Sequence, residues 1–182
     1  MTTVCVMGIG NVLMGDDALG PRMIETLDAI WRFPRQVTLL DAGTPGLDLT
    51  LFLEGFDALV AIDALKLDGP AGAVRSFRGE ELSDELPVVM SPHEPSLRES
   101  LLRLRLLGRG PREVLLIGAI PANISTGAPL SQALHLALPE IEARVIGELG
   151  RLGTPPARRA VPRIPNLWWE RSPACASASL AG

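Results

Sequence analysis

Three acidic side chains and one histidine are the residues of this chain whose types and positions could support chemistry. Asp16 and Asp17 close the glycine-containing stretch GIGNVLMGDD, Asp63 interrupts an apolar run, and His93 lies in the loop sequence SPHEP. Two carboxylates and one imidazole form a mixed oxygen and nitrogen ligand set that suits Zn²⁺, Ni²⁺ or Mn²⁺. Three protein ligands also leave a coordination position open for water or substrate. Asp17, Asp63 and His93 are therefore a candidate metal-binding set.

Each of these residues also has a purely structural interpretation. An aspartate near the start of a helix accepts backbone hydrogen bonds, so Asp16 is expected to cap the first helix while Asp17 faces the metal. Asp63 lies within the apolar run LVAIDAL, and a buried carboxylate needs a partner, which a hydrogen bond from a nearby loop could provide. The residues alone leave the structural and the metal-binding interpretations of Asp63 open.

Two other kinds of site fit the sequence less well. A dinucleotide-binding loop has the pattern G-x-G-x-x-G, but Leu13 stands at the third glycine position after Gly8 and Gly10. The two carboxylates that follow would repel a pyrophosphate at the helix N-terminus. A Ser-His-Asp triad would need Ser91 and His93, which are separated by a single proline, and the chain has no G-x-S-x-G elbow.

Apolar runs alternate with helical patterns along the first 150 residues. This alternation is typical of an α/β domain with a twisted, mostly parallel sheet, in which ligands bind at the carboxyl ends of strands. A turn and strand within 69–77 would make the sheet mixed. The expected strands are 4–9, 37–43, 58–65 and 113–120, and the expected helices are one ending near Phe33, a short one over 47–53, then 94–107 and 130–149.

The sequence divides into a body, residues 1–152, and a Pro- and Arg-rich tail, residues 153–182. Residues 151–182 contain five arginines and one glutamate, which leaves 20 acidic and 12 basic side chains in the first 150 residues. Such an acidic body is a poor nucleic-acid binder, because phosphate binding depends on Lys and Arg. We expect the tail to be a solvated extension, although Trp168 and Trp169 could instead dock on the body or on a partner.

Composition predicts a cytoplasmic globular protein. No window approaches the roughly 18 to 20 continuous apolar residues of a membrane helix, and the N-terminus lacks a basic leader region. The chain has two cysteines, which do not form a disulfide framework. Cys5 lies in an apolar run and is expected to be a small buried hydrophobe.

Five short motifs follow one another along the body: GIGNVLMGDDALG at 8–20, LDAGTPG at 40–46, IDA at 62–64, SPHE at 91–94 and IGAIP at 117–121. In this order and at this spacing they resemble the nickel–iron hydrogenase maturation proteases. The resemblance implies a single three-layer α/β/α domain and a monomeric endopeptidase that removes a C-terminal extension from a hydrogenase large-subunit precursor after nickel insertion. The second acid of the family's acidic pair matches Asp17, the strand-end aspartate matches Asp63, and the loop histidine matches His93. Ala18 and Glu94 depart from the residues common in the family.

The resemblance implies that the three residues contact nickel already held by the precursor, with zinc or cadmium able to take its place. Tight binding only in the presence of nickel would spare unfilled precursor, which is specificity by differential affinity. The metal could also polarise the scissile carbonyl or activate water. Two alternatives use the same residues: a nickel-gated chaperone that never cuts, and a general metallopeptidase that carries its own ion.

Overall fold

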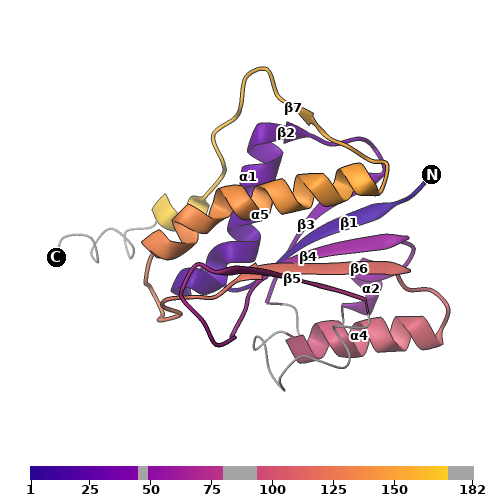
Figure 1. Cartoon of the computed structure of the whole chain (residues 1–182), viewed down its shortest axis with the longest axis horizontal. Helices are drawn as coiled ribbons and strands as arrows, with labels where there is room; N and C mark the ends of the chain where they lie inside the picture. The colour runs from indigo at the N-terminus through magenta and orange to yellow at the C-terminus, as the bar shows by residue number, and fades with distance from the viewer. Residues whose placement is uncertain (45–48, 80–93, 172–182) are drawn as a thin grey trace.

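A five-stranded sheet forms the centre of the computed structural model, which describes residues 1–44, 49–79 and 94–171 (Figure 1). The strand order is β3-β1-β4-β6-β5; β5 runs antiparallel to β6, and the other neighbours are parallel. This arrangement confirms the α/β class and the mixed, mostly parallel sheet. The strands are β1 (Val4–Ile9), β3 (Val37–Gly43), β4 (Ala58–Ala64), β5 (Val74–Arg78) and β6 (Glu113–Ala119).

Helices cover both faces of this sheet, so the domain has three layers (Figure 1). Successive β1 residues belong to opposite core clusters: Val4 and Val6 pack beneath α1 and α5, whereas Cys5 and Met7 pack beneath α2 and α4. A strand buried on both faces is apolar throughout, which is why its sequence shows no alternation. The helices are α1 (Leu19–Ile30), α2 (Thr50–Leu53), α4 (Glu94–Leu106) and α5 (Gln132–Arg151).

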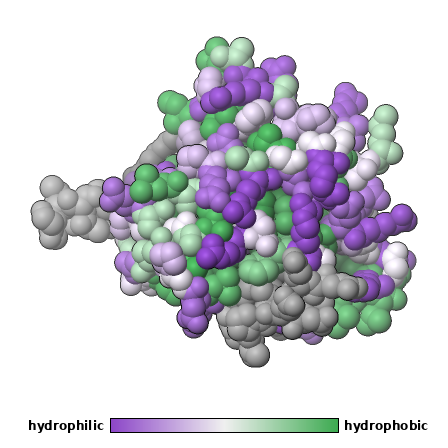
Figure 2. All heavy atoms as spheres, viewed as in Figure 1, coloured by the Kyte–Doolittle hydropathy of each residue, from purple (hydrophilic) through white to green (hydrophobic). Residues whose placement is uncertain are grey.

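The apolar stripe of α5 faces the sheet, whereas hydrophilic side chains lie over much of this helix on the face seen in Figure 2. The helix begins after Ser131, whose hydroxyl accepts a hydrogen bond from the Leu134 N–H. No helix within the described ranges has the length and hydropathy needed to cross a bilayer.

The order of the strands creates a switch point between β1 and β4. After β1 the chain crosses through α1 to β3 on one side, and it then returns through α2 to β4 on the other side of β1. Connections that leave two neighbouring strands in opposite directions open a crevice at their carboxyl ends, where α/β proteins bind ligands. The residues that follow β1 and those at the end of β4 meet at this crevice.

The first helix ends earlier than predicted. It is preceded by a 3₁₀ turn, η1 (Gly15–Ala18), and it ends at Ile30 instead of near Phe33. The predicted end was wrong because the next residues form the short strand β2 (Trp31–Arg32), which pairs antiparallel with β7 (Ala157–Arg158). The helix expected over 47–53 appears as α2, and residues 47–48 lie outside the described ranges.

The C-terminal segment packs on α1, which corrects the expectation of a solvated tail. Beyond β7, Arg159 and Arg163 donate backbone hydrogen bonds to the last residues of α1, and both side chains form ion pairs with Asp28, at 3.3 and 3.6 Å. Glu170 then pairs with Arg22, near the start of the helix. Residues 157–171, which we call the strap, thus run antiparallel along α1. The strap ends in the 3₁₀ turn η2 (Trp168–Arg171), and residues 172–182 lie outside the described ranges.

The two adjacent tryptophans of the strap offer a matched test of this docking. Trp169 is 5 % exposed, whereas Trp168 is 57 % exposed. Replacement of Trp169 by Ala should lower the free energy of unfolding by about 3 kcal/mol, because a buried indole is lost. The Trp168→Ala change should cost less than about 1 kcal/mol. Urea denaturation measures both, and equal effects would show that the strap is not docked in solution.

A buried carboxylate joins the end of α5 to the sheet. Glu148 is 5 % exposed, and its two oxygens accept hydrogen bonds from the guanidinium groups of Arg78 and Arg151. The bonds from Arg78, and then those from Arg151, lower the pKa of Glu148 to about 2, although burial acts in the opposite direction. Arg151 also pairs with Glu113 at the start of β6, which extends the network to a second strand.

This network predicts a specific loss of stability in acid. A carboxyl group whose pKa is lowered on folding stabilises the native state above its unfolded pKa, and the contribution disappears as the pH falls toward the folded pKa. For Glu148 the contribution should be complete above about pH 4.5 and lost toward pH 2, with a size of about 3 kcal/mol. Glu148→Gln should therefore destabilise the protein at pH 7 and flatten this part of its stability profile. Denaturation at a series of pH values measures the effect, and parallel profiles would contradict it.

Candidate active site

Glycines allow the start of α1 to lie directly on the ends of β1 and β4. A Cβ atom on Gly20 would lie 2.2 Å from the Ile9 carbonyl oxygen and 2.6 Å from that of Ile62. A Cβ atom on Gly8 would lie 2.4 Å from the Gly20 oxygen. Any side chain at these two positions would push the helix away from the sheet. The backbone contact therefore brings η1, the turn just before α1, to the carboxyl ends of both strands.

Asp17 lies in this turn and is largely buried. It is 8 % exposed, and its Oδ2 accepts a hydrogen bond of 2.8 Å from the Asn11 N–H. Gly10 makes the approach possible, because it has a φ of +139° and a Cβ there would lie 1.9 Å from the Asp17 carbonyl oxygen. Within the part of the chain that the structure describes, Oδ1 of Asp17 accepts no hydrogen bond and no Lys or Arg forms an ion pair with this carboxylate.

Asp63 is the penultimate residue of β4 and is 4 % exposed. Its Oδ1 accepts a hydrogen bond of 2.8 Å from the N–H of Ala64. Alternation along the strand places its side chain on the same face as those of Leu59 and Ala61, toward α2 and α4. Its register partner on β6 is Gly118, where a Cβ would lie 2.3 Å from the Asp63 carbonyl oxygen. The end of β4 is thus held closely against β6.

The third predicted ligand, His93, lies outside the described residues, as does Ser91 of the alternative triad. The described chain resumes at Glu94, the first residue of α4, and that end of the helix lies near the carboxyl edge of the sheet in Figure 1. Among residues 1–44, 49–79 and 94–171, no group of three His, Cys, Asp or Glu side chains could hold a metal ion. The described residues therefore include two of the three predicted ligands, Asp17 in the turn η1 and Asp63 at the end of β4.

Asp16, the neighbour of Asp17, has a different task. It is fully buried, and its carboxylate accepts three backbone hydrogen bonds, from the N–H groups of Ala122, Asn123 and Ser131 at 2.7, 3.0 and 2.6 Å. The prediction that Asp16 is structural is confirmed, but the expected helix cap is wrong. Asp16 holds the loop between β6 and α5 against η1, and nothing in the local sequence indicates partners more than 100 residues away.

Asp41, near the end of β3, also accepts a local hydrogen bond: its Oδ1 lies 2.9 Å from the Gly43 N–H. The prediction for Cys5, near the amino end of β1, is confirmed. Cys5 is fully buried, and burial raises the pKa of its thiol to about 12, so this side chain acts as a hydrophobe.

The carboxylate oxygens at the crevice suit a cation. Asp17 offers a carboxylate oxygen that no described group uses, in a crevice where an uncompensated negative charge is costly. Asp63 adds a second buried carboxylate on the neighbouring strand. Carboxylate and imidazole ligands together suit nickel or zinc. The carboxylates of Asp17 and Asp63 are therefore chemically suited to the metal contact that the sequence predicts.

The same substitution at the two adjacent aspartates should separate their roles. Asp16→Asn cannot satisfy three N–H donors with one amide oxygen, so unfolding should become easier by about 2–3 kcal/mol. Asp17→Asn keeps an oxygen for the single Asn11 N–H and should cost less than about 1 kcal/mol. Thermal or urea unfolding measures the difference, and a reversed order would contradict the assignment of roles.

Comparisons with known proteins identify relatives of the whole body of the chain. Residues 21–148 match the family described as hydrogenase maturation protease. The chain is 34 % identical over 164 residues to the hydrogenase expression/formation protein HoxM of Cupriavidus necator, covering 89 % of this chain and 81 % of that protein. It is 30 % identical over 162 residues to the hydrogenase 2 maturation protease of Escherichia coli, covering 88 % and 96 %. The solved structure of the hydrogenase maturating endopeptidase HybD from E. coli superimposes with a TM-score of 0.82 at 28 % identity, covering 87 % and 99 %. The chain therefore belongs to the hydrogenase maturation protease family and is a peptidase.

Proposed function

We propose that this chain is an endopeptidase that removes the C-terminal extension of a nickel–iron hydrogenase large-subunit precursor after nickel insertion. The observation that carries the proposal is the pair of buried carboxylates, Asp17 and Asp63, at the switch point of a domain that belongs to this family. The printed names of the relatives support a substrate from hydrogenase maturation. A cytoplasmic monomer is the expected form of the enzyme.

In this proposal Asp17, Asp63 and His93 contact nickel that the precursor already holds, so the metal belongs to the substrate. Asp17 comes from η1 and Asp63 from the end of β4, and backbone contacts at Gly20 and Gly118 fix both elements in place. Fixed ligands lose little freedom on binding, which favours a precursor with its nickel in place over an empty one. Bound in this way, the metal can polarise the scissile carbonyl or activate water.

Cleavage of a nickel-loaded precursor tests the three ligands. Asp17→Asn, Asp63→Asn and His93→Ala should each lower the rate by at least about 100-fold, since each removes a contact to the metal. Asp57→Asn is the matched control, because it removes an acid at the amino end of β4, away from the crevice, and keeps an acceptor for the Thr3 N–H. The mass of the large subunit reports cleavage, and normal processing by all three variants would refute the site.

Two further measurements separate the alternatives. A chaperone that never cuts would bind the precursor and leave its mass unchanged. A general metallopeptidase would carry stoichiometric metal after purification and cleave unrelated peptides. Mild acidification should lower the activity of the proposed enzyme, because ligation requires ionised aspartates and a neutral imidazole.

A further inference from the structure

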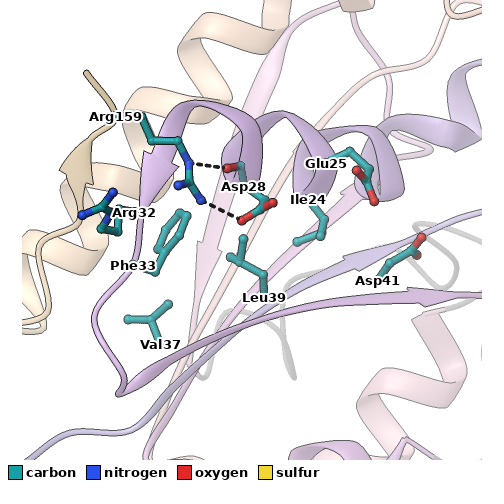
Figure 3. Close-up of a pocket in the computed structure, with 9 residues that line it drawn as sticks. All are labelled: Ile24, Glu25, Asp28, Arg32, Phe33, Val37, Leu39, Asp41 and Arg159. Carbon is teal, nitrogen blue, oxygen red and sulfur yellow. Dashed lines mark hydrogen bonds and ion pairs between the residues drawn. The ribbon is translucent and has the colours of Figure 1, made fainter. Parts of the chain in front are cut away.

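An elongated hollow of about 540 Å³ lies between α1 and β3, and the strap closes one end of it (Figure 3). Its lining is apolar along the middle, where Ile24 of α1 faces Leu39 of β3, with Val37 and Phe33 further along. Asp41 stands at the opposite end from Arg159, which holds Asp28. A hollow with apolar walls and charged ends suits side chains of a peptide better than a small polar ligand.

One wall of this hollow is the edge of the sheet. Among the described strands β3 has a neighbour on one side only, β1. The Val4 N–H donates to the Gln36 carbonyl, so even-numbered residues of β3 direct their backbone groups toward β1. Leu39 and Asp41 therefore direct their N–H and C=O groups outward, while their side chains line the hollow. An edge with unpaired backbone groups is a template for another strand.

The carboxyl end of this edge leads to the proposed catalytic crevice. Gly43, the last residue of β3, accepts a hydrogen bond of 2.8 Å from the Gly10 N–H. The next N–H along the chain, that of Asn11, donates to the Asp17 carboxylate. A segment paired with β3 would thus pass from the hollow to the side of Asp17 without a break.

Charges are unevenly distributed along the hollow. Asp28 is neutralised by Arg159 and Arg163 of the strap, so the strap end carries no net negative charge. Glu25 and Asp41 form no ion pair with any described residue, and both lie toward the crevice end (Figure 3). This end therefore attracts a basic side chain.

From these observations we propose that the outer edge of β3 binds the substrate segment around the cleavage point as an added β-strand. The inference rests on the proposed function, and it names the extended C-terminal segment of the precursor as the occupant. At about 3.3 Å per residue, β3 can pair with roughly six residues of this segment. Alternate side chains enter the hollow: an apolar one opposite Leu39 and a basic one near Glu25 and Asp41.

Amide hydrogen exchange, residue by residue, tests the pairing directly. The probe is a synthetic peptide that spans the cleavage point of the large-subunit precursor encoded in the same genome. Saturating peptide should slow exchange at least about tenfold at Leu39 and Asp41, whose N–H groups face outward. Exchange at Thr38 and Leu40 should not change, because these N–H groups already bond to β1. Unchanged exchange at Leu39 and Asp41 with the peptide bound would overturn the proposal.

A pair of adjacent substitutions tests the hollow with the intact precursor. Leu39 is half-buried in it, whereas Thr38 is exposed and projects from the other face of the same strand. Leu39→Glu should raise the KM for nickel-loaded precursor about tenfold or more, and Thr38→Glu should leave it near the wild-type value. Equal KM values for the two variants and wild type would also overturn the proposal, even if the peptide alone fails to bind.

The remaining outcomes separate this inference from the proposed function. If wild-type protein never shortens the precursor, the proposed function fails. If it does so and neither β3 measurement responds, only the added-strand proposal fails. Protection of Leu39 and Asp41 that grows with protein concentration in the absence of peptide would assign the edge to a second copy of this chain instead.

Discussion

The first turn of α1 lies backbone to backbone on the ends of β1 and β4, and the candidate site depends on this contact. Gly20 approaches the Ile9 and Ile62 carbonyl oxygens more closely than any side chain would allow, and Gly8 makes the reciprocal approach. Because helix and strands touch without intervening side chains, the short connection between them must fold into the crevice. The path of the backbone therefore places Asp17 in the crevice, independently of the hydrogen bonds that its carboxylate makes.

The adjacent acids Asp16 and Asp17 divide structure and chemistry between them. Asp16 uses both oxygens to bind three N–H groups of the β6–α5 loop and has no exposure to solvent. Asp17 uses one oxygen for the neighbouring turn, and no donor in the described ranges bonds to the other. A rigid partner beside a reactive group keeps that group in position with little loss of freedom on binding. The first carboxylate is thus the support for the second.

Local sequence patterns were sufficient for the strands and for Asp63, because a carboxylate within a long apolar run signals both burial and a strand end. The same patterns could not reveal the strap, since its pairing of β7 with β2 joins residues more than 120 positions apart. The early end of α1 was missed for the same reason: Trp31 and Arg32 continue a helical pattern and become extended only through that distant partner. The loop that Asp16 holds is likewise distant in sequence. A dinucleotide loop was judged a poor fit because Leu13 stands at the third glycine position, and the structure shows that Gly20 instead provides the close packing of helix on strand.

The strap also affects when α1 gains its stabilising contacts as the chain is synthesised. Asp28 belongs to α1, whereas its partner Arg159 is synthesised 131 residues later. Until then α1 lacks the hydrogen bonds and ion pairs that the strap makes with it. Contacts of such long sequence separation form late in folding. The helix that follows the Asp17 turn thus reaches its full stability only after the strap has been synthesised, so the crevice is fully supported later than the strands that form it.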